Sequence, residues 1–299
     1  MLREFAAIGL SKYTGQMAAT DLIGSMIREG NLRGASFTKD GKNYLEVAYE
    51  MGPFQMIMRG ERISPGFFNV ELAVPALKEK RGYALLEPEV FKGEKDLLYI
   101  EGTEAASLET MTLCLTDTWR YYHEPDVFRK SPITVSCYGL STEGKVLLGI
   151  YRSKEDIEFI RQEEEYRHEM LKEAHKGSFA AMAELKSSDE LSDREVLDRL
   201  KTEDALSIYD GFFYPSEKDE NCFALLGDIR QVEKLMNPYS EEWVYYLELD
   251  VLGQLLRVLI NPCDLTGEPK PGRRFMGKAR FYGRLDPARI ILENSRQFF

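Results

Sequence analysis

Two β-rich stretches of this chain flank a long charged segment, and this change in composition constrains the fold most. Residues 154–204 carry sixteen acidic and nine basic side chains and no proline. Such a segment favours helices with solvated faces, with a break expected at Gly177. We therefore predict an α+β domain over residues 1–152, a helical connector over 153–206 and a β-rich domain over 207–299.

The first unit is predicted to contain an antiparallel sheet with helices. Apolar spacing indicates a short helix from Thr20 that ends at Gly30. Strand-like runs follow it, and Asp40-Gly41 and Gly52-Pro53 mark the turns between the first three. The expected strands are Arg33–Thr38, Tyr44–Met51, Phe54–Arg59, Phe67–Leu77, Tyr83–Leu86 and Leu97–Ile100.

Two further segments complete the first unit. Ala106–Tyr122 is predicted as a helix, although alternating threonines leave a strand open. Ile133–Leu140 and Val146–Tyr151 are predicted as a hairpin, because the turn-like Ser141–Gly144 lies between them.

The C-terminal unit repeats the strand signal in a short length of chain. Its strands suit a small closed or partly open five-stranded barrel, and an oligonucleotide-binding type is one member of that class. The expected strands are Ile208–Tyr214, Cys222–Val232, Trp243–Asp250, Leu255–Ile260 and Arg274–Leu285.

A basic segment near the C-terminus reverses the charge of the chain. Residues 267–289 carry seven cations and two acids, whereas the whole chain has a formal charge of -11. Interleaved aromatic rings suit contact with an anionic partner, either RNA or an acidic protein. The candidate binding residues are Lys270, Arg273, Arg274, Lys278, Arg280, Tyr282 and Arg284.

Strand alternation predicts how the end of this basic segment is arranged. Lys278, Arg280, Tyr282 and Arg284 are expected on one face, with Tyr282 open for stacking, and Phe281 on the other. The alternative is an ion-pair face, in which Arg273 and Arg274 neutralise acids of the helical connector.

Common catalytic and cofactor signatures are missing from the sequence. Its four cysteines are scattered singly and its three histidines form no ligand pattern, so we expect buried thiols, no metal and no cofactor. The N-terminal apolar stretch Phe5–Leu10 is too short to enter a membrane. A cytoplasmic location is therefore predicted.

Several segments resemble a bacterial domain-of-unknown-function family of Gram-positive anaerobes. The resemblance implies an intracellular protein with a β-rich C-terminal module and implies no activity, substrate or catalytic residue. It rests on AAIGLSK at Ala6–Lys12, LSTEGKVLLGI at Leu140–Ile150, TEDALSIYDGFFYP at Thr202–Pro215 and DLTGEPKPGRRFMGKARFYGRL at Asp264–Leu285.

Three hypotheses for function follow from these observations. The first is a non-enzymatic interaction or regulatory protein that uses the basic face of the C-terminal barrel. The alternative is an enzyme that uses carboxylates on a small molecule held in a cleft between the domains. The third is a structural subunit that works as a homo-oligomer.

Overall fold

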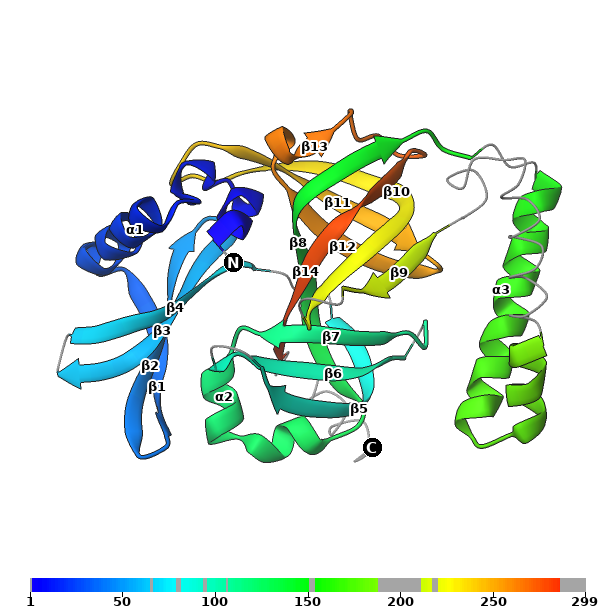
Figure 1. The fold of residues 1–299 in the computed structure, drawn as a ribbon, viewed down its shortest axis with the longest axis horizontal. Helices are drawn as coiled ribbons and strands as arrows, with labels where there is room; N and C mark the ends of the chain where they lie inside the picture. Colours follow the sequence, from blue (N-terminus) through cyan, green and yellow to red (C-terminus); the bar gives the residue numbers. More distant parts are fainter. Residues whose placement is uncertain are drawn as a thin grey trace, which may run out of the picture.

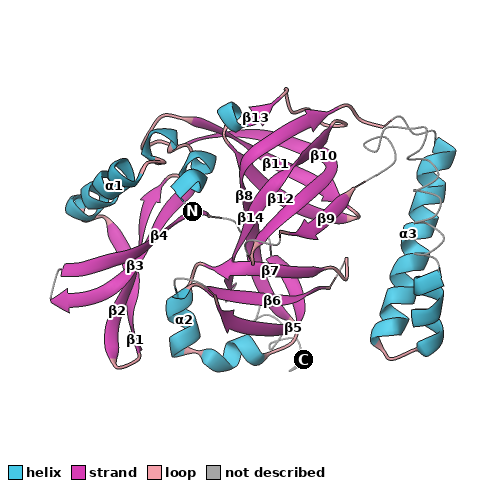
Figure 2. Ribbon diagram, in the orientation of Figure 1, coloured by secondary structure: helices cyan, strands magenta, loops and turns pink. Residues whose placement is uncertain are grey.

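The described part of the computed structural model is built mainly of β-strands with a few helices (Figures 1 and 2), which fits the predicted α+β class. It comprises residues 2–64, 67–78, 82–93, 96–105, 107–150, 154–187, 211–216 and 220–285. The helices are α1 (Gln16–Glu29), α2 (Thr118–His123) and α3 (Lys154–His175), with short 3-10 turns at Leu2–Ile8, Ser11–Tyr13, Pro125–Arg129 and Pro262–Asp264.

The described strands belong to two sheets. The four-stranded sheet A contains β1 (Leu32–Lys39), β2 (Lys42–Met51), β3 (Phe54–Ser64) and β4 (Phe67–Leu77). The larger sheet B contains β5 (Gly82–Lys92), β6 (Leu98–Glu104), β7 (Thr110–Leu115), β8 (Ile133–Leu147), β9 (Phe212–Pro215), β10 (Cys222–Met236), β11 (Trp243–Val251), β12 (Gln254–Ile260), β13 (Leu265–Thr266) and β14 (Arg274–Leu285).

Sheet A is the antiparallel sheet that the sequence predicts. Its strands pair in chain order, β1-β2-β3-β4. Asp40 and Gly41 both have positive φ in the turn between β1 and β2, as a tight hairpin requires. Gly30 ends α1 in the left-handed conformation, and its N–H donates to the Ile27 carbonyl. These turn and cap predictions are confirmed.

Sheet B is organised around a long ribbon formed by β8 and β14, which pair from Val135 with Leu285 to Leu147 with Arg274. One closed ring of strand pairings runs β8-β12-β11-β10-β14, and a second runs β8-β5-β6-β7-β14. The two rings share the ribbon. Strands from both sides of the helical connector therefore make one continuous sheet.

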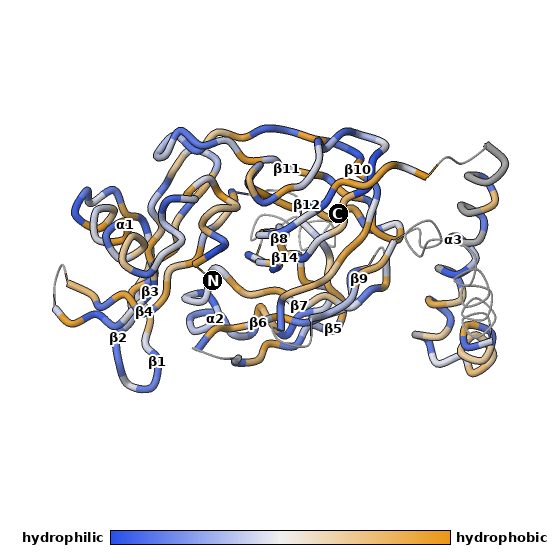
Figure 3. Tube along the Cα trace, turned by 45° about the horizontal axis from the view of Figure 1, so that its top comes forward, coloured by the Kyte–Doolittle hydropathy of each residue, from blue (hydrophilic) through white to orange (hydrophobic). Residues whose placement is uncertain are grey.

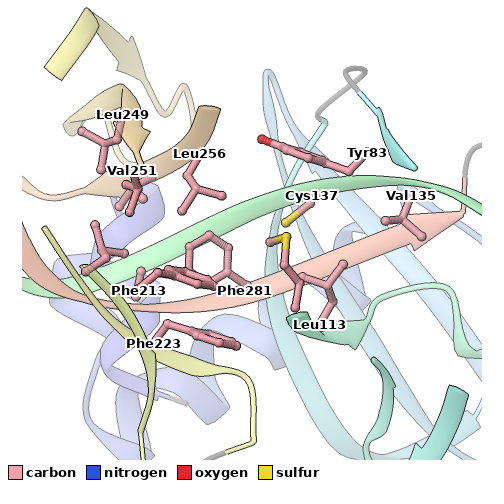
Figure 4. Close-up of a cluster of buried hydrophobic side chains, with 14 of the residues drawn as sticks. Tyr83, Leu113, Val135, Cys137, Phe213, Phe223, Leu249, Val251, Leu256 and Phe281 are labelled. Atoms are coloured by element: carbon pink, nitrogen blue, oxygen red, sulfur yellow. The ribbon is translucent and has the colours of Figure 1, made fainter. Parts of the chain in front are cut away.

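The main hydrophobic core fills the interior of these rings. Phe213 and Phe223 stack with ring centroids 4.3 Å apart, and both contact Phe281 edge-on. Figure 4 shows these three aromatic side chains at one end of the core, with Leu113 and Cys137 further along the ribbon. Burial of these large apolar and aromatic side chains is the dominant force that keeps the two rings of strands closed.

A second hydrophobic core joins sheet A to the outer face of the ribbon. Phe5 and Ile8 of the N-terminal turn pack in a cluster with Met26 of α1, and with Tyr138 and Tyr282 of the ribbon. Figure 1 shows the N-terminal turn between sheet A and the rings. This cluster brings sheet A close enough to sheet B to form a shared polar site.

The predicted hairpin through Ser141–Gly144 is wrong, because β8 runs without a turn from Ile133 to Leu147. Its partner β14 pairs along this whole length, and a register shift opposite Lys278 and Ala279 accommodates one extra residue. A bulge, rather than a turn, explains this polar sequence.

The predicted helix over Ala106–Tyr122 is also mostly wrong. Thr110–Leu115 forms β7, as the alternating threonines left open, and helix α2 begins only at Thr118. Pairing with β6 and β14 covers both edges of this strand, and the two hydrophobic cores bury its two faces, with Leu113 in one core and Cys114 in the other. Tertiary pairing therefore overrides the local helical pattern.

The C-terminal ring differs in membership from the predicted five-stranded unit. Strands β10, β11, β12 and β14 lie where expected, but β8 completes the ring and β9 adds to the edge of β10. The predicted start of β9 at Ile208 lies outside the described residues.

Helix α3 occupies the predicted connector and stands to one side of the rings (Figure 1). The expected break at Gly177 is confirmed by its positive φ, and residues 179–187 are helical again. Figure 3 shows that hydrophilic residues form the tip of the β1–β2 hairpin, at the end of sheet A.

Candidate functional site

The cations at the start of the basic segment are held by neighbouring groups of the protein. Lys270 forms an ion pair with Glu268 at 2.8 Å, and Arg273 donates to the carbonyl of the same residue at 2.9 Å. Arg274 is buried, and its Nε donates to the Leu148 carbonyl at 3.1 Å. Glu268 and Leu148 both lie outside the helical connector, whose acids the ion-pair alternative named as the partners of Arg273 and Arg274.

Strand β14 alternates as predicted, with Phe281 in the ring core and Tyr282 in the cluster beneath sheet A. Tyr282 is only 2% exposed, and its hydroxyl bonds to the buried Glu4. It also stacks on Tyr138 at 5.8 Å. The expectation that Tyr282 is open for stacking is wrong, because the N-terminal turn covers it.

The charged side chains of β14 differ in their surroundings. Arg280 forms a 2.8 Å ion pair with Glu4, and the exposed Lys278 lies 3.4 Å from Glu143. Arg284 is exposed and has no ion-pair partner among the described residues. Among the seven candidate residues, Arg284 is the one that lines the polar cavity described below.

A cavity of about 430 Å³ lies between sheet A and the end of strand β7, and we call it the Asp117 cavity. Its volume lies within the range of small-molecule sites. One wall comes from β1, β2 and β3, and the other from the β7–α2 junction and β14. The lining residues are Arg33, Gly34, Ala35, Glu46, Val47, Ala48, Glu50, Gln55, Ile57, Thr116, Asp117, Trp119 and Arg284.

Strand pairing places the polar side chains of the sheet A wall. Glu46 of β2 lies directly opposite Arg59 of β3, and their charged groups are 3.9 Å apart. Glu50 lies opposite Gln55, four residues further along β2 and on the same face. Gly34 permits the close approach of β1, because an added Cβ would lie 2.0 Å from the Glu46 carbonyl oxygen.

The start of α2 places the opposite wall. Asp117 Oδ2 accepts from the Leu285 backbone N–H at 3.2 Å and lies 3.8 Å from Arg120 Nε. Its Oδ1 is buried and has no hydrogen-bond partner among the described residues. The Trp119 backbone N–H donates to Glu46 Oε1 at 3.5 Å, so this wall contacts the sheet A wall directly.

Further polar contacts fix α2 against sheet A. Arg59 donates to the Thr118 hydroxyl, and His123 Nε2 lies 2.7 Å from the Ser36 carbonyl oxygen of β1. The rings of Phe37 and Tyr122 stack at 5.0 Å. Contacts from several elements therefore fix the position of one cavity wall relative to the other.

Burial raises the pKa values of Glu46 and Asp117 by different amounts. It raises the pKa of Glu46 to about 8; Arg59 opposes this effect and the charge of Asp117 adds to it. Burial also raises the pKa of Asp117 to about 6, against the lowering effects of Arg120 and Arg284. At pH 7 Glu46 is therefore mostly protonated and Asp117 mostly ionised.

This arrangement provides one proton donor and one acceptor on facing walls of the same cavity. Pairs of carboxyl groups whose environments separate their pKa values are typical of acid–base sites. No local sequence pattern reveals this pair, because seventy residues separate its members. A usable signal was the alternation in β2, which places Glu46, Ala48 and Glu50 opposite the apolar face.

Other chemical features of the described residues are sparse. No group of three or more His, Cys, Asp or Glu side chains there is arranged to hold a metal ion. Cys114, Cys137 and Cys222 are buried thiols as expected, whereas Cys263 is exposed, so that part of the prediction is wrong. No helix in the described ranges has the length and apolar character needed to cross a bilayer.

The fold and the site define an α+β protein in which an N-terminal sheet covers paired strand rings and encloses a polar cavity against them. The chain belongs to DUF3881, a domain-of-unknown-function family described from an E. rectale gene, whose family model matches residues 5–283. The predicted family type is thereby confirmed. No curated protein and no solved structure matches the chain.

Proposed function

We propose that this protein binds a small polar molecule in the Asp117 cavity, where Glu46 and Asp117 act as proton donor and acceptor. The observation that carries the proposal is the pair of buried carboxyl groups with separated pKa values on facing walls. General acid–base catalysis needs a donor and an acceptor that are both competent near neutral pH. This is the carboxylate alternative of the sequence analysis, now with named residues.

The carboxylate of Asp117 supports binding of a ligand. Asp117 lines the cavity, and its Oδ2 accepts from the Leu285 backbone N–H. A carboxylate can accept several hydrogen bonds, so a donor group on a bound molecule can add to the bond from Leu285. Preorganised polar groups of this kind are typical of binding sites rather than of purely structural interfaces.

The sequence-based alternative, docking of an anionic partner on the basic segment, has weaker support. Lys270, Lys278 and Arg280 each have an acidic partner in the protein, and Arg274 is buried. A binding assay with single-stranded RNA at two salt concentrations tests it. Salt-sensitive binding that Lys278→Glu abolishes favours docking over the cavity.

Two finer features remain part of this proposal. The ring β8-β12-β11-β10-β14 has the strand number of a small barrel, and we propose that it serves as a rigid support for the cavity rather than as a nucleic-acid module. We also retain the predicted cytoplasmic location, which the free cysteines support.

The intrinsic fluorescence of Trp119 tests the proposal. The chain has two tryptophans, so a Trp243→Phe variant leaves Trp119, in the cavity wall, as the sole emitter. We expect its emission to change saturably with at least one small probe from a set of acetate, inorganic phosphate, glycine, glycolate, methylammonium and glycerol. The matched control is Trp119→Phe, in which only the distant Trp243 reports.

Two results would contradict the proposal. One is that no probe changes the Trp119 emission. The other is that a response survives equally in the Trp119→Phe control, because binding then occurs outside the cavity.

A further inference from the structure

The Asp117 cavity carries two unpaired cations in addition to its acidic pair. Arg33 comes from β1 and Arg284 from β14, so they reach the cavity from different sheets. Both are exposed, and neither has an ion-pair partner among the described residues. A guanidinium group matches the planar geometry of a carboxylate, which can accept two parallel hydrogen bonds from it.

The acids around these arginines leave room for a bound anion. Glu50 is already paired with Lys78 at 2.8 Å, and Glu46 is mostly neutral at pH 7. Asp117 is mostly ionised at pH 7, and its ion pair with Arg120 is a long one, at 3.8 Å. The cavity therefore offers cations and an acceptor together.

We propose that the bound molecule is a small carboxylate that carries a hydroxyl or ammonium group beside the carboxylate. Arg284, assisted by Arg33, binds the carboxylate, and the Asp117 carboxylate accepts from the neighbouring hydroxyl or ammonium group. This inference rests on the proposed function and names its ligand class. The volume of about 430 Å³ is sufficient for a small molecule of this kind.

Isothermal titration at pH 7 with four molecules of nearly equal size tests the inference. Butyrate has the carboxylate alone, 1,2-butanediol has hydroxyl groups alone, and 2-hydroxybutyrate and 2-aminobutyrate combine a carboxylate with a donor. We expect one or both of the combined molecules to bind about tenfold more tightly than butyrate, since a hydrogen bond to a charged group contributes about that factor. Comparison of the two shows whether the donor is hydroxyl or ammonium.

Two variants separate the contributions of the two ends. Arg284→Gln should weaken all three carboxylates about tenfold and leave butanediol unchanged, whereas the matched control Arg273→Gln, outside the cavity, should change nothing. Asp117→Asn removes the negative charge but keeps an acceptor oxygen. It should abolish a preference for 2-aminobutyrate and retain one for 2-hydroxybutyrate.

The outcomes distinguish this inference from the proposed function. Equal affinity for butyrate and both combined molecules overturns the ligand class, as does an unchanged affinity in Arg284→Gln. If none of the four binds while other probes change Trp119 emission, the ligand class is wrong and the cavity function stands. If nothing changes Trp119 emission, the cavity function itself is wrong.

Discussion

Replacement of Glu46 by glutamine should change how the stability of the protein depends on pH. Burial raises the pKa of Glu46 from 4.5 to about 8, while Arg59 and the backbone N–H groups of Thr118 and Trp119 lower it and Asp117 raises it. In the unfolded chain the group returns to its ordinary pKa. Between these two values the native state holds a proton that the unfolded state has released.

The size of the effect follows from this interval. Each pH unit contributes about 1.4 kcal/mol, so the free energy of unfolding falls by on the order of 5 kcal/mol as pH rises from 4.5 to about 8. The direction is a loss of stability with rising pH, because the unfolded state binds fewer protons. Glu46→Gln keeps the size of the side chain and a donor group but cannot ionise, so the contribution of this position to the free energy of unfolding does not change with pH.

Urea unfolding of both proteins at pH 6, 7 and 8 measures this difference. The stability of the variant relative to the wild type should rise by about 2 kcal/mol between pH 6 and pH 8. Glu50→Gln is the matched control on the same face of β2, because Glu50 has a lowered pKa and is ionised in both states over this range. Parallel pH profiles for wild type and Glu46→Gln would refute the reasoning.

Two further substitutions test the packing around the ribbon. Arg280→Met should destabilise the fold by about 3 kcal/mol, because it leaves the buried Glu4 without its ion pair, and the control Arg273→Met should change stability by less than about 0.5 kcal/mol. Equal effects in urea unfolding would show that the pair is unimportant. Gly144→Ala should cost about 1–3 kcal/mol, because its Cβ would lie 2.5 Å from the Phe275 ring. If Gly144→Ala has the melting temperature of the wild type, the Phe275 ring shifts without loss of stability.

Local sequence signals predicted the parts of the fold that depend on local chemistry. The turn at Asp40-Gly41 and the end of α1 at Gly30 both require positive φ, which few residues adopt easily, so they are readable from sequence. Ser141–Gly144 shows the limit of such signals. The same polar residues suit a turn or a bulge, and the partner β14, more than 120 residues later, decides between them.

The candidate site depends on contacts that no local pattern contains. Arg284 was a candidate from sequence, but its role in a cavity follows from the closeness of β14 to the start of α2. Tyr282 appeared available because strand alternation gives the face of a side chain and not what covers that face. Glu46 and Asp117 are notable only through burial, which comes from the packing of sheet A on the rings.

A crystal structure of the protein soaked with 2-hydroxybutyrate tests the central claim most directly. The account predicts electron density for the molecule inside the Asp117 cavity, with its carboxylate at Arg284 and its hydroxyl at the Asp117 carboxylate. An empty cavity in which Arg284 has turned inward to pair with Asp117 would contradict it, because the protein would then satisfy its own charges without a ligand.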